Sequence, residues 1–463
     1  MPLGIGIDYG TSNSAAASFD GETLRAIPLD AAAAPGGSVM PTALYLDRKL
    51  GATVGQPAID RYVRENVGRR IELAREDLGE LAITVAETED TKVGGEGLHV
   101  VARVHAFTDQ GQPGRLFRGV KRWLANRKLE RVRVFGARFR VVSLVTPILA
   151  CVEAASRAAR AEPARVYVGR PVHYEGASGD GDALAVERMR EACGYAGFPG
   201  ATLWPEPIAA SLSYLHRARE SQSRCVLTFD FGGGTLDLSL LRARGEAFEL
   251  LAVDGIGLGG DELNRIVYRA VVFPELGEGL EHHVPVLDER KRVRFPFERF
   301  EGRLLNWPLA YELNRPELRE EIVQAMREGP EARQRLGRLL ELIRGYRAYA
   351  VVQAIEAAKL ALSSAERTRI VEPDLDLDVP LSRAQFERLL APSLARIDAC
   401  LDGLLARAGL PAASVDVVVR TGGSSSIPAV IARLEQRFPG RVVEHDRFTS
   451  IAAGLAVASF REQ

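Results

Sequence analysis

The sequence predicts an α/β protein made of two similar lobes that face one another. Segments with strand character alternate with segments of helical spacing along the chain, which is the pattern of this class. In addition, one short pattern occurs twice, at residues 4–15 ("GIGIDYGTSNSA") and 226–239 ("VLTFDFGGGTLDLS"). Each copy has an apolar strand, an aspartate, an aromatic residue, glycine and a hydroxyl residue before a second strand. The copies stand about 220 residues apart, far beyond a solenoid repeat of about 20–50 residues, so we expect one copy in each lobe.

Composition limits the class of protein further. The 463 residues, 46% hydrophobic and 26% charged, are typical of a globular chain with two to four domains or lobes at roughly 100–200 residues each. A net charge of −1 and a pI of about 6.7 favour neither nucleic acid nor an acidic membrane as partner, and they leave the oligomeric state open. No apolar run approaches the roughly 20 residues of a membrane span, and "MPLGIGIDYG" lacks the basic start of a signal peptide. The four cysteines are widely spaced, so we expect reduced thiols in a cytoplasmic protein.

The elements of the first half follow from local periodicity and glycine turns. We expect, in order, a strand–turn–strand unit, a helix, a strand and two helices, at residues 3–19, 143–161, 164–172, 183–197 and 206–220. These elements predict a first lobe at residues 1–222. Its core is expected at about 1–42 and 142–222, with an inserted subdomain at about 43–141.

The second half begins with the second copy of the hairpin. After it we expect a strand–turn–helix unit, a long helix, another strand–turn–helix unit and a last helix of small residues, at 249–271, 346–366, 416–438 and 449–460. Residues 273–340 have weaker periodicity. The predicted second lobe covers residues 223–463, with its core at about 223–260 and 392–463 and its inserted subdomain at about 261–391.

Both glycine turns carry groups that a plain connection does not need. Backbone N–H groups in a glycine turn form an anion-binding nest that phosphate oxygens can approach closely. Asp8, Asp230 and Asp237 would repel phosphate, so the pattern calls for a cation between them. Magnesium suits this role because it is held through one or two carboxylates, waters and substrate phosphates. An ordinary tight hairpin remains the alternative for either turn alone, and the two turns together favour a phosphate site.

Several stretches in order resemble a known superfamily. The segments "IGIDYGTSNS", "FDFGGGTLDLSLL" and "VVVRTGGSSSIPAVIARLE" resemble the first phosphate, second phosphate and adenosine motifs of the actin / sugar kinase / heat-shock chaperone superfamily. Four more, "FRGVKRWLA", "WPEPIAASLSYL", "GLGGDELNRIV" and "IEAAKLALSSAE", resemble its heat shock protein 70 (DnaK-type) branch. "VGRPVHYEG" and "DRFTSIAAGLA" look closer to a short bacterial subgroup typified by YegD. The resemblance covers nearly the whole chain, except residues about 43–110 and 273–350. It implies a two-lobed actin-like ATPase fold, in which each lobe has a ribonuclease H-like core and an inserted subdomain.

The resemblance also implies roles for particular residues, with ATP or ADP and Mg²⁺ as ligands. Asp8 and Asp230 would bind the hydrated magnesium. Gly10, Thr11, Ser12 and Asn13 would cradle the phosphates opposite Gly232, Gly233, Gly234 and Thr235. Lys121 would sit against the γ-phosphate and the attacking water, and Glu206 and Asp237 would order the metal-bound and attacking waters. With Asp230 and Thr235 these residues form the implied catalytic set. Glu356, Lys359, Ser363, Gly422 and Gly423 would border the nucleoside, and Gly259, Gly260 and Ser426 complete the implied nucleotide-binding set. Hydrolysis by a positioned water fits such a set, because this chemistry relies on geometry and electrostatics.

The expected function is that of a slow, chaperone-like ATPase whose nucleotide state controls an unknown protein client or regulator. The alternative is an actin-like assembly or binding module with little hydrolysis. A small-molecule kinase ranks third, because no aspartate base for an acceptor is found. The family's long members continue into a peptide-binding domain, whereas this chain stops at "ASFREQ", so we expect none here. The insertion at about 273–350 is then the expected partner surface.

Two further features concern ligand recognition. The family has arginines at the positions of Leu360 and Ser426, where they hold the base between guanidinium planes. Their replacement predicts micromolar or weaker ATP binding with poor discrimination against GTP, unless another arginine reaches in. Residues 115–140 carry ten arginines or lysines against one glutamate. This segment predicts either a solvated basic face or contact with an anionic partner.

Overall fold

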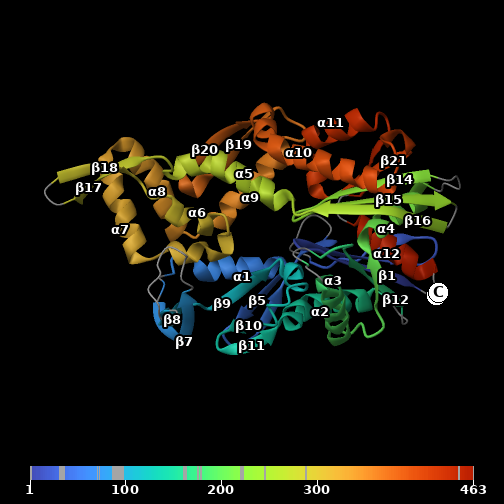
Figure 1. The fold of residues 1–463 in the computed structure, drawn as a ribbon, viewed down its shortest axis with the longest axis horizontal. Helices are drawn as coiled ribbons and strands as arrows, with labels where there is room; N and C mark the ends of the chain where they lie inside the picture. Colours follow the sequence, from blue (N-terminus) through green and yellow to red (C-terminus); the bar gives the residue numbers. More distant parts are fainter. Residues whose placement is uncertain are drawn as a thin grey trace.

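The computed structural model divides into two lobes that lie one above the other along the molecule (Figure 1). It describes residues 3–30, 37–69, 71, 73–85, 98–159, 164–174, 177, 180–218, 224–244, 247–286, 289–446 and 449–461. The central sheets of the lobes gather at one end of the view, and the inserted subdomains extend to the other end. The α/β class and the two-lobed arrangement predicted from the sequence are confirmed.

Lobe I is organised around a six-stranded sheet. Its strand order is β13 (Thr202–Pro205), β12 (Arg165–Arg170), β1 (Gly4–Tyr9), β2 (Asn13–Phe19) and β3 (Leu24–Ala26), with β4 (Val39–Pro41) also paired to β2. Side chains alternate across β1. Ile5 and Ile7 pack against α2 (Val141–Ala158) and α3 (Gly181–Tyr195). Gly4 and Gly6 leave the other face open to the close approach of α12 (Ser450–Arg461).

The position of α12 differs from the boundary expected from chain order. Residues 392–463 were expected in the core of lobe II, yet α12 packs on the sheet of lobe I. A Cβ atom on Gly6 would lie 2.0 Å from the carbonyl oxygen of Ala452, so only glycine allows this approach. The chain therefore returns to its first lobe at the end of the described residues.

Helix α2 is the most apolar long helix of the described ranges. Its 18 residues have a mean hydropathy of 1.5, which by length and composition would suffice to cross a membrane. No apolar run near that length is expected from the sequence. Half of this stretch is buried inside the protein, where Leu144, Ile148 and Leu149 contribute to the core of lobe I. Packing in that core therefore accounts for its apolar character.

Lobe II repeats the plan with a five-stranded sheet. The order is β16 (Ala247–Ile256), β15 (Leu236–Arg244), β14 (Arg224–Phe231), β21 (Val417–Thr421) and β22 (Val442–Glu444). One face packs under α5 (Gly260–Val267), α10 (Arg383–Ala408) and α11 (Pro428–Arg437). On the other face, Val226 and Val417 meet Tyr214 of α4 (Glu206–Ala218). Helices α4 and α12 consequently lie between the two sheets (Figure 1).

The inserted subdomains are different in kind. That of lobe I is mostly strands: β5 (Ala43–Asp47), β6 (Ala52–Val54), β7 (Leu73–Val85), β8 (Leu98–Asp109), β9 (Gly114–Arg118), β10 (Arg131–Val134) and β11 (Ala137–Arg140), with α1 (Gln56–Asn66) and the short helix η1 (Val120–Trp123). That of lobe II is mostly helical despite its weak periodicity: η2 (Tyr268–Val272), η3 (Phe273–Leu276), β17 (Glu281–Val286), β18 (Glu289–Arg294), α6 (Glu298–Leu304), η4 (Trp307–Leu313), α7 (Pro316–Ala325), η5 (Met326–Glu328), α8 (Pro330–Arg344), α9 (Ala348–Ala361), β19 (Arg367–Glu372), η6 (Pro373–Leu375) and β20 (Leu377–Ser382). The helix expected at 346–366 begins at Ala348, because Tyr346 has a left-handed φ of 52°.

The two inserted subdomains are joined by an aromatic bridge, which we define as Tyr62 of lobe I with Trp307 and Tyr346 of lobe II. The hydroxyl of Tyr62 donates to the carbonyl of Pro308, and that of Tyr346 donates to the carbonyl of Trp307 at 2.9 Å. The Tyr62 ring lies 6.2 Å from the Trp307 ring and 5.9 Å from the Tyr346 ring. All three side chains are at most 4% exposed, so one hydrophobic core runs across both lobes at this end.

Candidate functional site

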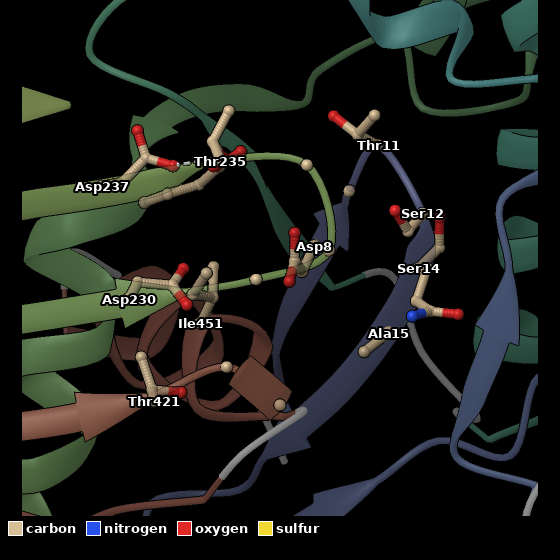
Figure 2. A pocket seen from close by; sticks show the side chains of 18 of the residues that line it. Asp8, Thr11, Ser12, Ser14, Ala15, Asp230, Thr235, Asp237, Thr421 and Ile451 are labelled. Atoms are coloured by element: carbon tan, nitrogen blue, oxygen red, sulfur yellow. Dashed lines mark hydrogen bonds between the residues drawn. The ribbon is translucent and has the colours of Figure 1, made fainter. Parts of the chain in front are cut away.

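The two predicted glycine hairpins face each other across the interlobe cleft (Figure 2). The turn between β1 and β2 and the turn between β14 and β15 enclose a cavity of about 130 Å³. Its lining includes Asp8, Gly10, Thr11, Ser12, Asn13, Lys121, Glu206, Asp230, Gly232, Gly233, Gly234, Thr235, Asp237, Gly422 and Gly423. The structure thus brings together both phosphate hairpins and every residue expected to position magnesium or the attacking water.

Close backbone approach explains the glycines in these turns. A Cβ atom on Gly233 would lie 2.5 Å from the Ser12 hydroxyl oxygen of the opposite hairpin. A Cβ atom on Gly259 would lie 2.4 Å from the carbonyl oxygen of Gly233. Gly422 has a φ of 80°, and a Cβ atom there would lie 2.4 Å from the carbonyl oxygen of Phe231. Larger residues would force these loops apart, so the narrow cradle depends on glycine.

Four carboxylates line the small cavity: Asp8 and Glu206 of lobe I, and Asp230 and Asp237 of lobe II. Burial raises the pKa of Asp8 to about 7, with a further increase from the negative charge of Glu206 and an opposing effect of Lys121. Burial also raises the pKa of Asp230 well above its usual value, and the charge of Asp237 adds to this. Buried anions of this kind gain most from a cation placed among them. The donor set therefore fits a magnesium ion.

The small number of carboxylates that could contact one ion also matches a hydrated magnesium ion. Within the described ranges, no three His, Cys, Asp or Glu side chains come together as an all-protein metal cluster. Magnesium, however, usually keeps several waters and takes only one or two carboxylates together with substrate phosphates. Asp8 and Asp230 would hold it in this way, with Asp237 in reach of its waters.

Lys121 lies in the wall of the small cavity, paired with Glu206. Its Nζ donates to Glu206 Oε1 at 2.7 Å, and the side chain is only 7% exposed. Burial lowers the pKa of Lys121, but the charges of Glu206 and Asp8 outweigh it, so the pKa is raised. A Cβ atom on Gly169 would lie 2.8 Å from Glu206 Cγ, so this glycine makes room for the carboxylate. On the opposite hairpin, the Thr235 hydroxyl donates to Asp237 at 2.7 Å.

A second cavity of about 630 Å³ continues from the tips of the hairpins into lobe II. Glu356, Lys359 and Ser363 of the α9 region line it, together with Gly260 and Gly423. Lys359 Nζ donates to the Gly260 carbonyl at 3.2 Å and to Asn264 Oδ1 at 2.6 Å, while burial lowers its pKa. This arrangement places a polar pocket next to the two glycine hairpins, where the sequence predicted the nucleoside.

Two predicted residues lie outside both linings, and several lining residues were missed. Gly259 supports the hairpin from behind, and Ser426 is 6% exposed, with a buried hydroxyl that has no hydrogen-bond partner. Lining residues absent from the prediction include Arg118, Arg122, Asp261, Asn264, Arg265, Thr421 and Ser424. Asn264 lies within "GLGGDELNRIV" and Ser424 within "VVVRTGGSSSIPAVIARLE". The polar residues of these motifs could therefore have been predicted as lining residues. Arg118 and Arg265 show that arginines other than those of the family pattern do reach this cavity.

Comparisons with known proteins agree with this geometry. A family model described as Hsp70 protein matches residues 185–273 and 346–459. The chain is 28% identical over 309 residues to the chaperone protein dnaK of Cyanophora paradoxa, covering 64% of this chain and 40% of that protein. It is 29% identical over 266 residues to the chaperone protein DnaK of Deinococcus deserti, covering 54% of this chain and 32% of that protein. The similarity thus spans less than half the length of each of these relatives.

Proposed function

Because the chain belongs to the Hsp70 family, we propose that it binds Mg-ATP between its lobes, hydrolyses it slowly, and uses its nucleotide state to control a protein partner. The observation that carries this proposal is the meeting of two glycine hairpins around Asp8, Asp230 and the Lys121–Glu206 pair. The backbone of both turns would bind the phosphates, and the cavity beside Lys359 would take the nucleoside.

The buried groups would divide the chemistry among them. A bound magnesium ion would neutralise charge on the β- and γ-phosphates. Lys121 would place a compact positive charge beside the γ-phosphate, which suits lysine better than the wide fork of arginine. Glu206, fixed by Lys121, and Asp237, fixed by Thr235, would accept hydrogen bonds from the attacking water and orient it. No group of this set forms a covalent intermediate, and all act by position and charge.

Binding and turnover test this proposal separately. Calorimetry at millimolar magnesium should show ATP binding, and phosphate release should show turnover without any added acceptor. Asp8→Asn and Lys121→Ala should each lower kcat by about 100-fold or more, with a change of at most about fivefold in nucleotide affinity, since their effect falls mainly on the transition state. Lys291→Ala, which removes an exposed lysine of β18, is the matched control. Absence of ATP binding by the wild-type protein would refute the proposal.

The control of a partner needs its own experiment. Capture from the native host with bound ATP or ADP should recover a protein in one nucleotide state and not in the other. The candidate surface for that protein is the helical part of the lobe II insertion, α6 to α8. Glu317→Lys combined with Glu320→Lys, at two exposed positions of α7, should weaken partner capture and leave ATP binding intact, and unchanged capture by this variant would contradict the assignment.

A further inference from the structure

The 630 Å³ cavity extends beyond the polar nucleoside end, into a space beneath the aromatic bridge. We call this space the insert compartment, lined by Gln56, Ile59, Arg118, Leu305, Trp307 and Tyr349. One wall comes from the inserted subdomain of lobe I and the other from that of lobe II. The bridge holds the two walls together through the hydrogen bond from Tyr62 to Pro308, while the bond from Tyr346 fixes Trp307 within lobe II. The compartment is therefore closed on the side where the inserted subdomains meet.

Most of this lining is apolar. It differs in this from the phosphate end of the cavity, by which we mean the part lined by Thr11, Ser12, Gly232 and Gly233. Ile59 and Leu305 face the cavity from opposite lobes, and Tyr349 stands beside Trp307 with ring centroids 4.6 Å apart. Concave, mainly apolar walls with a few placed polar groups are typical of small-molecule sites. The whole cavity, with its nucleoside end included, falls within the roughly 300–1,000 Å³ of such sites.

Arg118 is the exception in this apolar lining. Its guanidinium lies 5.6 Å from the centre of the Trp307 ring, and its side chain is half-buried. Within the ranges that the structure describes, Arg118 has no hydrogen bond and no carboxylate at ion-pair distance, and its Nε is buried without a partner. Arg265 of the same cavity, by contrast, pairs with Glu262 at 3.2 Å. A partly buried cation without an acceptor is costly, so the position of Arg118 suits an anion that comes from outside the chain.

We propose that the insert compartment binds a small organic anion, with its carboxylate or phosphate on Arg118 and its apolar body against Ile59, Leu305 and Tyr349. A guanidinium offers paired N–H donors that match either anion. Arg118 and residues 305–308 lie outside the segments matched by the Hsp70 family model. This ligand adds to the proposed nucleotide and does not replace it, since the compartment is lined by the inserted subdomains, whereas the phosphate hairpins belong to the core sheets of the two lobes.

The test uses 2-naphthoate as a ring with a carboxylate and 2-naphthamide as its neutral counterpart. Calorimetry should show naphthoate binding at least about tenfold tighter than naphthamide, the usual scale of a charge-assisted hydrogen bond. Arg118→Gln should remove this preference and leave naphthamide binding unchanged. Arg118→Lys should keep part of it, because the charge remains and the fork is lost. Arg64→Gln is the matched control, since it removes an exposed arginine of α1 outside the lining.

Measurements with and without Mg-ADP separate this inference from the proposed function. Naphthoate should bind in both conditions, and the measurement without nucleotide remains informative even if ATP binding fails. Equal naphthoate affinity of wild type and Arg118→Gln would show that Arg118 only supports Trp307, and would overturn the proposal. Strict competition between naphthoate and Mg-ADP would also overturn it, by placing the probe at the nucleoside end. No naphthoate binding at millimolar concentration would have the same consequence.

Discussion

The interlobe cleft has two ends: the phosphate end between the two glycine hairpins, and the insert end where the aromatic bridge joins the inserted subdomains. The contacts that join the lobes differ between these two ends. At the phosphate end, the two hairpins approach one another through glycine and small residues, as where the backbone of Gly233 meets the Ser12 side chain. At the insert end, large aromatic side chains fill the space, and hydroxyls such as that of Tyr62 reach backbone carbonyls of the other lobe. The first kind of contact fixes the position of backbone donors, whereas the second buries apolar area. We therefore expect the phosphate end to determine chemistry and the insert end to determine how readily the cleft opens.

The most sensitive position should be at the small-residue packing beneath the phosphate end. A Cβ atom on Gly454 of α12 would lie 1.7 Å from the carbonyl oxygen of Ala209 of α4. Gly454→Ala should therefore destabilise the protein by more than about 4 kcal/mol, the range of severe overpacking and backbone clashes. Urea unfolding, or loss of soluble protein, measures this effect. Gly302→Ala in α6 is the control, because no atom lies within 4 Å of its added Cβ and the helix should gain slightly. Similar stabilities of the two variants would contradict the close approach of α4 and α12.

Removing an aromatic side chain from the bridge should be nearly as costly. Trp307 is 4% exposed and contacts Tyr62, Tyr349 and Arg118. Trp307→Ala should lower the free energy of unfolding by about 3–5 kcal/mol and accelerate nucleotide release, because the inserted subdomains would separate more easily. Stopped-flow measurement of labelled ADP release tests the second effect. Leu309→Ala, at a 38% exposed position of the same short helix η4, should change neither quantity measurably. Unchanged ADP release from Trp307→Ala would show that the bridge does not limit opening.

The same difference between the two ends explains what the sequence could predict. Close backbone contacts demand glycine at fixed spacings, so both phosphate hairpins stand out in a single sequence. The bridge has no such spacing, because Tyr62 and Pro308 are brought together from opposite lobes by the packing of bulky side chains. The place of α12 was missed for another reason: chain order suggested lobe II. Gly4 and Gly6, alternating with Ile5 and Ile7, were the signal for a helix packed closely on lobe I.

A third contact between the lobes should respond to pH. His445 follows β22 of lobe II, and its Nε2 lies 2.8 Å from the Ser213 hydroxyl of α4. Burial lowers the pKa of His445 to about 4, and the positive charge of Arg217 adds to this. The unfolded chain, with a pKa near 6.5, takes up the proton first as the pH falls. Stability from this group is therefore complete above pH 6.5 and is lost progressively towards pH 4.

The size of this effect follows from the shift. Between pH 7.5 and pH 5, His445 should cost the wild-type protein about 2 kcal/mol, at roughly 1.4 kcal/mol per pH unit below the unfolded pKa. Urea unfolding of wild type and His445→Gln at both pH values isolates this contribution from those of the carboxylates. Between the same two pH values, the decrease in the free energy of unfolding should be smaller by about 2 kcal/mol in His445→Gln than in the wild type. An equal loss in both proteins would mean that the ring is protonated in the folded state as well.

The smallest expected effect is on nucleotide affinity. It concerns the nucleoside end of the large cavity, lined by Glu356, Lys359 and Leu360. Leu360 lines the large cavity and is 65% exposed, so an arginine at this position has room to lie over the base. A stacked cation contributes about 0.5–2 kcal/mol, and Leu360→Arg should tighten ATP binding by about 2- to 30-fold. The matching change at Ser426 is unsuitable, because an arginine would be forced into a buried position away from the cavity. Competition calorimetry with ATP and GTP on wild type, Leu360→Arg and Leu360→Lys separates stacking from charge, since lysine restores only the charge. Nanomolar and strictly adenine-selective binding by the wild type would show that another group, such as Arg265, already covers the base.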